Sequence, residues 1–189
     1  MAQLRSVAGK LIVFSAPSGT GKTAIKNELV KKDPTLVFSI SATTREKRED
    51  EHDGKDYYFI SEEEFKDHIE HNDFIEYDHH FGNYYGTLRM AVEPDLKVGC
   101  NVIMDIDVNG ALTVKKNFPD QSVLIFIKPP SMEELKKRLM ARGTENDENL
   151  KVRLARVAEE MDKAHHFDHV VINDTIERAA NEILDIIRK

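Results

Sequence analysis

The segment from Leu11 to Thr23 constrains the fold more than any other part of the chain. It begins with an unbroken apolar run, which is typical of a strand that is buried on both faces of a parallel sheet. A turn of small residues follows, and a helical pattern begins at Lys22. A strand, a glycine-containing loop, Lys-Thr and a helix together predict a phosphate-binding loop. An ordinary strand–turn–helix connection is the alternative, but the agreement of motif and context favours phosphate binding.

Each residue type in this loop suits the binding of a nucleoside triphosphate. Glycines allow backbone N–H groups to approach the phosphates at the positive end of the new helix. We expect Lys22 to reach the β- and γ-phosphates and the hydroxyl of Thr23 to ligate Mg²⁺. The predicted ATP-binding residues of the loop are Ala16, Pro17, Ser18, Gly19, Thr20, Gly21, Lys22 and Thr23, where Ala16 replaces the usual first glycine.

Composition limits the class of protein. A chain of 189 residues suits one compact domain with a small insertion. No apolar run approaches the ~20 residues of a membrane-spanning helix, and the 32% of charged residues indicates a soluble protein. The net charge of −7 argues against broad nucleic-acid binding. A single cysteine, Cys100, fits a reducing cytoplasm, and we expect its thiol to be buried or half-buried.

Five apolar runs alternate with helical patterns along the chain. This alternation predicts an α/β fold, with a parallel five-stranded sheet of the phosphate-loop kinase type flanked by helices. The second strand is expected to be short and buried. The five runs are Leu11–Phe14, Leu36–Ile40, Val102–Asp107, Val123–Ile127 and Val170–Ile172.

Two windows interrupt the alternation. Residues 41–92 hold all five tyrosines and a run of charges, and a capping box at Ser61–Glu64 separates two strand-like runs. This window predicts a small α+β insertion. A polar break at 143–147 lies between two helical patterns and predicts a helical lid over residues 131–156. The core segments are then 1–40, 93–130 and 157–189.

Charged side chains fall where phosphates and a metal would be bound. Arginines bind phosphate bidentately and stay charged, so two arginine windows suggest two phosphate clamps. Solvated ion pairs with glutamate are the alternative, which is equally favoured for Arg156. An acid at the carboxyl end of a neighbouring strand helps to hold Mg²⁺ in phosphate-loop proteins. Asp105 and Asp107 both stand at such an end, so we expect one of them to serve the metal together with Thr23, and a solvent-facing strand end is the alternative. The arginine windows are Arg45 and Arg48, and Arg138, Arg142, Arg153 and Arg156.

A series of further motifs resembles, in order and spacing, the motifs of the guanylate kinase family. The resemblance covers essentially the whole chain. It implies transfer of the γ-phosphoryl group of ATP to GMP, and also to dGMP, with Mg²⁺ in purine nucleotide metabolism. The motifs are Ser41–Arg45, Arg48, Gly54–Tyr57, Phe74–Glu76, Gly82–Thr87, Asp105–Asp107, Arg142–Thr144 and Ile172–Asp174.

The resemblance also implies residue roles by matched position. Arginines and tyrosines would contact the GMP phosphate, carboxylates would accept hydrogen bonds from guanine, and Asn173 would lie near the adenine of ATP. A buried carboxylate would be left unpaired by the N1 lone pair of adenine, which predicts rejection of AMP. The implied GMP-binding residues are Ser41, Arg45, Arg48, Tyr57, Glu76, Tyr85, Thr87 and Asp107. With Asp107 given to guanine, we assign Asp105 to the metal together with Thr23. The implied catalytic residues are Lys22, Arg45, Arg138, Arg142 and Arg153.

Departures from the family pattern are few. Glu46-Lys47 replaces the proline that usually stands between the two GMP-side arginines, which predicts a more flexible loop, and Asn109 stands where glutamine is common. A non-catalytic binding module of the same fold is one alternative, and it is disfavoured by the presence of Lys22, Thr23 and the lid arginines. Another small phosphate-loop kinase is the second alternative, and it is disfavoured by the acceptor pair Glu76 and Asp107.

Histidine clusters at 79–80 and 165–169 invite a metal hypothesis, but surface histidines are favoured because no cysteine accompanies them. The sequence therefore predicts a cytoplasmic enzyme, monomeric or homodimeric, whose partners are ATP and GMP and not nucleic acid or a membrane.

Overall fold

The structure of the chain, a computed structural model, describes residues 8–80, 82–141 and 147–189, without the side chains of 141–152. The fold is mixed α/β, and its five-stranded parallel sheet has the order β2-β7-β1-β8-β9. The prediction of an α/β fold with such a sheet is confirmed. The strands of this sheet are β1 (Leu11–Ser15), β2 (Val37–Phe38), β7 (Val102–Asp105), β8 (Ser122–Lys128) and β9 (His169–Ile172).

The chain divides into two compact units, which are described separately. The first unit comprises residues 8–11, Val37–Asp105 and Asn109–Ser122. The second unit comprises Ile12–Leu36, Ile106–Val108 and Val123–Lys189. The predicted insertion therefore belongs to the first unit, whereas the phosphate loop belongs to the second.

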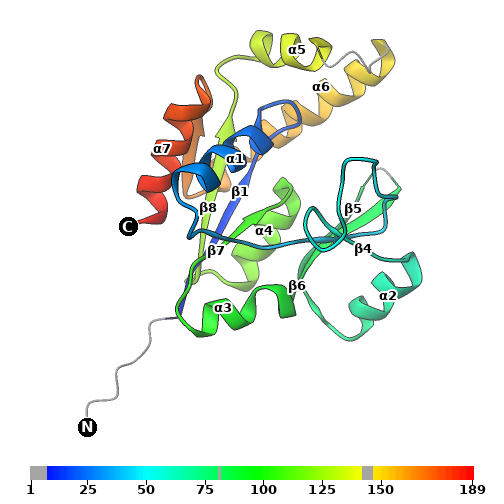
Figure 1. Cartoon of the computed structure of the whole chain (residues 1–189). Helices are drawn as coiled ribbons and strands as arrows, with labels where there is room; N and C mark the ends of the chain where they lie inside the picture. The colour runs from blue at the N-terminus through cyan, green and yellow to red at the C-terminus, as the bar shows by residue number, and fades with distance from the viewer. Residues whose placement is uncertain (1–7, 81, 142–146) are drawn as a thin grey trace. The chain divides into compact units, whose positions relative to one another are not determined.

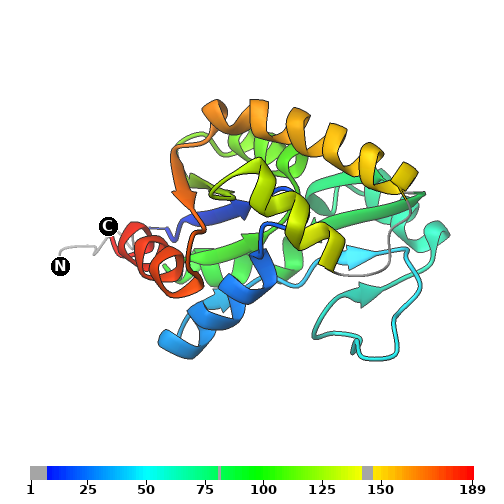
Figure 2. The same cartoon turned by 90° about the horizontal axis from the view of Figure 1, so that it is seen from above.

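Apolar strands and two neighbouring helices form the core of the second unit. The side chains of β1 and the central part of β8 are almost fully buried, as expected for strands covered on both faces. Helix α1 (Lys22–Lys32) lies beside α7 (Ile176–Ile187), as Figures 1 and 2 show. Helix α7 begins where the Thr175 hydroxyl accepts a hydrogen bond from the Arg178 backbone N–H at 3.3 Å. This packing fixes the start of α1, where the phosphate loop ends.

Two further helices of the second unit pack through a small apolar cluster. Helix α5 (Met132–Ala141) contributes Leu135 and Leu139, and α6 (Asp147–Asp162) contributes Val157. These three side chains are at most 1% exposed. The Ser131 hydroxyl accepts a hydrogen bond from the Glu134 N–H at 3.1 Å and caps α5. The short 3₁₀ helix η2 (Lys163–His166) follows α6.

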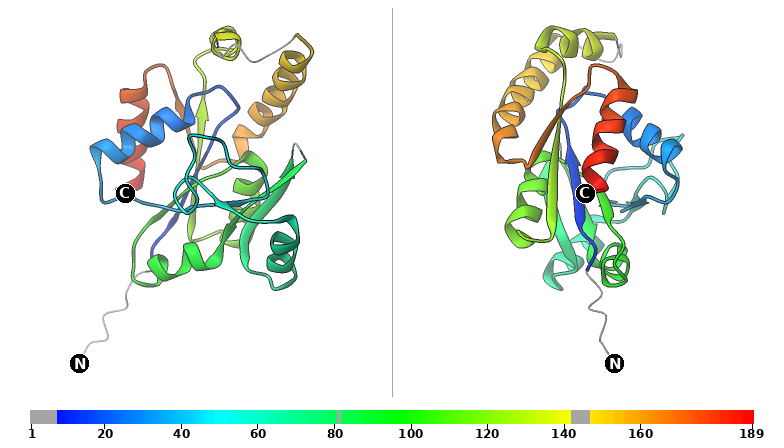
Figure 3. Two further views of the ribbon diagram at one scale, coloured as in Figure 1. Left: turned by 45° about the vertical axis from the view of Figure 1, so that its right-hand side comes forward. Right: turned by 90° about the vertical axis from the view of Figure 1, so that its left-hand side faces the viewer.

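A four-stranded sheet and one covering helix dominate the first unit. The sheet has the order β4-β3-β6-β5, and only the β3–β4 pair is parallel. Helix α2 lies against it (Figure 3). Phe65 of the helix stacks on Phe74 of β5 with 4.4 Å between the ring centroids. The predicted cap of α2 forms, since the Ser61 hydroxyl accepts from the Glu64 N–H at 3.1 Å. The elements are β3 (Ala42–Thr43), β4 (Tyr58–Phe59), α2 (Glu62–Glu70), β5 (Phe74–His80) and β6 (Asn83–Leu88).

Some features of the first unit differ from the sequence expectations. Strand β2 is half-buried, not buried, because Val37 and Phe38 pair with β7 alone at the end of the sheet order. The predicted burial of Cys100 is wrong, because its thiol is exposed in the connection that leads into β7. Strand β3 and α3 (Glu93–Lys97) were not predicted, and the remaining elements are η1 (Arg89–Ala91) and α4 (Val108–Asn117). Across the helices of the described residues, none has the length and apolar character to cross a membrane.

Candidate nucleotide sites

The phosphate loop has a backbone that only glycine adopts readily. Gly19 and Gly21 have φ values of 85° and 98°, in the left-handed region. A Cβ atom on Gly21 would also lie 2.8 Å from the Asn173 Nδ2, and one on Gly19 would lie 2.7 Å from a Leu139 methyl group. Gly21 is the N-cap of α1, so the loop leads directly into a helix N-terminus that attracts anions.

Side-chain contacts fix this loop from three other parts of the second unit. The Lys22 ammonium donates to the Ile106 carbonyl at 3.1 Å. The Thr20 carbonyl accepts from Asn173 Nδ2 at 2.7 Å and from Arg138 Nη1 at 3.4 Å. Asn173 is 2% exposed, so its hydrogen bond to Thr20 is buried. The two residues are far apart in the sequence. Lys22, Arg138 and Asn173, three of the predicted residues, therefore meet at or beside the loop.

A cavity of about 430 Å³ opens beside the loop. The Oδ1 atom of Asn173 is buried and has no hydrogen-bond partner within the described part of the chain. This amide oxygen can accept a hydrogen bond from an exocyclic amino group such as that of adenine. The sequence interpretation had missed two of the lining residues, Asp174 and Ile176. The cavity is lined by Gly19, Gly21, Arg138, Asn173, Asp174 and Ile176.

The predicted lid arginines are only partly described. Arg142 lies outside the described residues, and Arg153 is half-buried. Arg156 donates to Glu160 at 2.8 Å, which favours the ion-pair interpretation of that arginine. Burial raises the pKa of Glu160, while the hydrogen bond from Arg156 acts in the opposite direction, and the negative charge of Asp107 adds a smaller upward contribution. Glu160 was not singled out from the sequence, because one glutamate in a charged helix carries no distinguishing pattern.

The two predicted metal ligands lie in different units. Thr23 is exposed in the first turn of α1 in the second unit, and Asp105 is the half-buried last residue of β7 in the first unit. A hydroxyl and a carboxylate are hard oxygen donors, which fits Mg²⁺. Each residue has the chemistry that the prediction requires.

A buried polar chain lies between β5 and β6 in the first unit. Glu76 and Thr87 are directly paired across the two strands, and the Thr87 hydroxyl donates to Glu76 Oε1 at 2.7 Å. The hydroxyls of Ser41 and Thr87 are 3.3 Å apart. Glu76 is 4% exposed and Thr87 is fully buried. A carboxylate is rarely buried without a partner of this kind, so the pair forms a fixed hydrogen-bond acceptor.

Close packing of the strands that carry this pair requires a glycine in β6. A Cβ atom on Gly86 would lie 2.9 Å from Phe74 Cδ1 and 2.9 Å from Tyr77 Cβ. A bulge between Phe74 and Glu76 shifts the register of β5 against β6. Gly86 therefore permits the approach that sets Glu76 opposite Thr87.

An arginine–glutamate pair organises the loop after β3. Arg45 donates to both carboxylate oxygens of Glu51, at 3.0 and 2.7 Å. Donating these hydrogen bonds to Glu51 raises the pKa of Arg45, and accepting them lowers the pKa of Glu51. The Arg48 backbone N–H also donates to Glu51 at 2.9 Å. Glu51 thus holds the side chain of Arg45 and the backbone of Arg48. Sequence reasoning missed it, because it lies inside a charged run.

Two tyrosines complete this polar group. The guanidinium of Arg45 lies 5.6 Å from the ring centroid of Tyr57, in cation–π range. The rings of Tyr57 and Tyr85 meet edge to face at 6.2 Å. The side chain of Arg48 is exposed. The structure therefore brings Arg45, Tyr57 and Tyr85 together as a basic and phenolic surface, a combination that suits a phosphate.

Asp107 and the histidine clusters are the remaining residues that the sequence singled out. Asp107 is half-buried and belongs to the second unit, directly before α4. His79, His165, His166 and His169 are exposed, as expected, whereas His80 is half-buried.

The fold and the loop define a phosphate-loop nucleotide kinase. The family model described as guanylate kinase matches residues 8–189. A guanylate kinase of Chlorobium luteolum is 46% identical over 184 residues, which cover 97% of this chain and 93% of that protein. One of Chlorobaculum tepidum is 50% identical over 175 residues, covering 93% and 90%. The crystal structure of guanylate kinase from Anaplasma phagocytophilum matches with a TM-score of 0.80 at 35% identity, covering 96% of this chain and 86% of that one. The chain belongs to the guanylate kinase family, and the predicted family and enzyme class are confirmed.

Proposed function

We propose that this chain transfers the γ-phosphoryl group of ATP to GMP, and to dGMP, giving ADP and GDP, through the residues described above. Membership of the guanylate kinase family supports the reaction. The observation that carries the residue assignment is the buried acceptor Glu76, held by Thr87, in the same unit as the Arg45–Glu51 pair. A hydrogen-bond acceptor for a base and a cation for a phosphate, present in one compact unit, suit the binding of a nucleoside monophosphate.

Guanine recognition rests on the acceptor character of Glu76. The Thr87 hydroxyl donates to Glu76 Oε1, and a carboxylate has lone pairs enough to accept further hydrogen bonds from the N1–H or the exocyclic amino group of guanine. Asp107 supplies a second acceptor, and Ser41 and Thr87 add hydroxyls. AMP would present the lone pair of its N1 to a buried carboxylate, which costs about 1–3 kcal/mol or more. We therefore assign Ser41, Glu76, Thr87 and Asp107 to the base.

Phosphate recognition on the GMP side rests on Arg45, Arg48, Tyr57 and Tyr85. Glu51 holds Arg45 in place through two hydrogen bonds, so the guanidinium is oriented before the substrate arrives. The exposed side chain of Arg48 is free to reach a ligand phosphate from the solvent side. This set provides charge neutralisation without a general base, because a phosphate monoester is largely dianionic at neutral pH.

The donor side rests on residues 16–23 and Asn173. The loop backbone and the Lys22 ammonium would hold the triphosphate, and the Asn173 oxygen would accept from the adenine amino group. Arg138, beside the loop at Thr20, would neutralise charge on the transferred group, with Arg142 and Arg153 as further candidates from the proposed lid. Residues 131–156 remain the lid and 41–92 the GMP-binding insertion in this proposal.

Mg²⁺ is part of the same proposal, with Thr23 and Asp105 as its ligands. When bound, the ion would neutralise charge on the β- and γ-phosphates and help to align them. We further propose a cytoplasmic protein, monomeric or homodimeric, that binds neither nucleic acid nor a membrane.

A substrate panel tests the function. ADP release is followed in a coupled assay with ATP and each of GMP, dGMP, AMP, CMP and UMP. The proposal predicts turnover with GMP and dGMP and far less with the other three. Equal rates with AMP would refute the guanine assignment, and GMP binding without turnover would favour a non-catalytic binding module.

A further inference from the structure

Two adjacent histidines near the end of β5 contact two adjacent tyrosines of β6, one in a tilted arrangement and one in a parallel stack. The ring of His79 lies 4.4 Å from that of Tyr84 with an interplanar angle of 42°. The ring of His80 lies 4.4 Å from that of Tyr85 with an angle of 8°, which is a parallel stack. Neighbouring residues of a strand point to opposite faces of a sheet, so the two stacks lie on opposite faces. The hairpin thus offers a test position and a matched control.

The two faces have different surroundings. Tyr84 stacks on Phe65, a fully buried residue of α2, at 5.2 Å, so the tilted contact of His79 with Tyr84 lies on the side of the sheet that faces α2. Tyr85 instead meets Tyr57, whose ring lies beneath Arg45. Tyr85 also adds to the rise in the pKa of Arg45. Of the two histidine–tyrosine contacts, only that of His80 therefore adjoins the surface formed by Arg45, Tyr57 and Tyr85.

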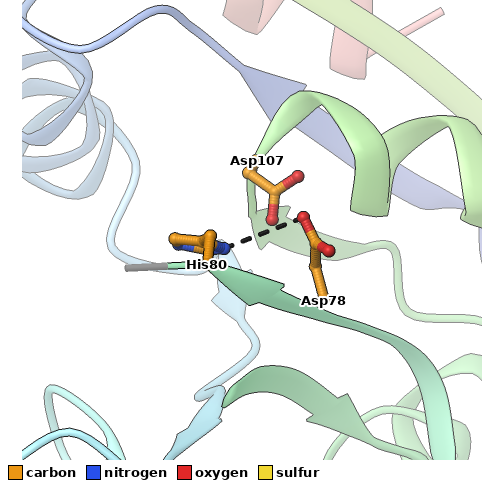
Figure 4. Close-up of side chains that lie close together, drawn as sticks. All are labelled: Asp78, His80 and Asp107. Carbon is orange, nitrogen blue, oxygen red and sulfur yellow. Dashed lines mark ion pairs between the residues drawn. The ribbon is translucent and has the colours of Figure 1, made fainter. Parts of the chain in front are cut away.

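His80 lies next to an acidic side chain. Its Nδ1 atom lies 3.7 Å from Asp78 Oδ2, and the two side chains point toward each other (Figure 4). Their exposed fractions are 20% and 25%, so both are largely shielded from water. Asp78 is fixed in turn, because its Oδ2 accepts from Asn109 Nδ2 at 3.2 Å and its Oδ1 from the His79 N–H at 2.8 Å. A line of contacts thus runs from Asn109 through Asp78 and His80 to Tyr85.

We infer that His80 is a positioning residue for the acceptor phosphate: anchored by Asp78, its imidazole covers one face of the Tyr85 ring and fixes the phenol hydroxyl beside Arg45. The inference rests on the proposed assignment of Tyr85 to the GMP phosphate. Tyr57 bounds the ring of Tyr85 at an edge, so the face covered by His80 is the second constraint on its rotation. His80 acts through Tyr85 and need not touch the substrate.

Steady-state kinetics of His80→Ala and His79→Ala test this role. We expect His80→Ala to raise the KM for GMP by about three- to tenfold, the range of an aromatic stack, with the KM for ATP and kcat unchanged. His79→Ala should leave the KM for GMP within about twofold of the parent value, because its stack faces the core. His80→Phe, which keeps a stacking ring, should recover most of the loss. Equal values of KM for GMP in the two alanine variants would overturn the inference.

A double-mutant cycle separates positioning from a general structural effect. Tyr85→Phe keeps the ring but removes the hydroxyl that His80 is inferred to place. In that background, His80→Ala should raise the KM for GMP no further, whereas additive effects would show that His80 does not act through the hydroxyl. Thermal unfolding of each variant checks that the fold is kept. If the parent enzyme itself failed to phosphorylate GMP, the proposed function would fail; if it is active and His80→Ala matches His79→Ala, only this inference fails.

Discussion

The phosphate loop of the second unit and the acceptor group of the first unit suit phosphates by different means. In the loop, the backbone provides the binding groups, because two glycines with positive φ expose N–H groups at the start of α1. In the acceptor group, side chains from separate segments provide the binding groups. They are in contact with one another and comprise Arg45, Glu51, Tyr57 and Tyr85. A backbone site depends on a few positions, whereas a side-chain network spreads its dependence over many. Substitutions on the two sides should therefore differ in what they change.

The largest effect is expected on the loop side. Lys22→Ala removes the ammonium assigned to the β- and γ-phosphates, and should lower kcat by at least about 100-fold, as losses of preorganised charge do. Lys31→Ala is the control, because Lys31 lies in the last turn of the same helix with a side chain that is 78% exposed. Similar losses of kcat in both variants would contradict the assignment.

The next effect concerns base selection on the acceptor side. Glu76→Gln exchanges a carboxylate oxygen for an amide group and should raise the KM for GMP by about 10- to 100-fold, corresponding to about 1–3 kcal/mol. The ratio of GMP to AMP turnover should fall as well. Glu63→Gln on the exposed face of α2 serves as the control. An unchanged GMP preference in the Glu76 variant would remove this residue from the site.

A smaller effect is expected where the network depends on a residue that need not touch substrate. Glu51→Gln should raise the KM for GMP by about three- to tenfold and lower the free energy of unfolding at pH 7 by about 1–3 kcal/mol. Glu49→Gln, exposed in the same loop, should change neither quantity.

The contribution of Glu51 to the free energy of unfolding should also depend on pH. Arg45 lowers the pKa of Glu51 below its ordinary value of 4.5. The ionised carboxylate therefore stabilises the folded state above about pH 4.5, and this contribution is lost as the pH falls through the lower pKa of the folded protein. The difference in unfolding free energy between the parent and Glu51→Gln should shrink below pH 4.5. A difference that stays constant between pH 7 and pH 3 would be inconsistent with this pair.

The smallest effect is expected at the cavity beside the loop. Asn173→Ala removes the hydrogen bond to the Thr20 carbonyl and the acceptor assigned to adenine, so the KM for ATP should rise about fivefold, near 1 kcal/mol. The KM for GMP should not change. Asn27→Ala, exposed on α1, is the matched control. A rise in the KM for GMP with an unchanged KM for ATP would contradict the assignment of Asn173 to ATP.

The same contrast explains how much the sequence could predict. The phosphate loop is contiguous, so its strand, turn and helix were recognisable from thirteen neighbouring residues. The five-stranded sheet followed from apolar runs, whose pattern survives without knowledge of the fold. The family resemblance supplied Glu76 and Thr87, but their direct contact depends on the register of β5 and β6 and on the space above Gly86.

Other residues could not be found because their signals are not local. Glu51 is one of several acids between Arg45 and Asp56, and only the folded loop selects it as the partner of Arg45. His80 looked like a surface histidine, since nothing near it in sequence identifies Tyr85 as its stacking partner across the hairpin. The exposure of Cys100 was mispredicted, because an apolar strand next to it suggested burial, whereas the residue lies in the connection between α3 and β7.

We propose that donor and acceptor are bound by separate groups of residues with separate chemistry. Calorimetric titration of GMP alone, without ATP, into the parent protein, Lys22→Ala and Glu76→Gln tests it most directly. We expect the same Kd for GMP in the parent and Lys22→Ala, and a Kd raised about 10-fold or more in Glu76→Gln. Loss of GMP binding in Lys22→Ala, or full retention in Glu76→Gln, would contradict it.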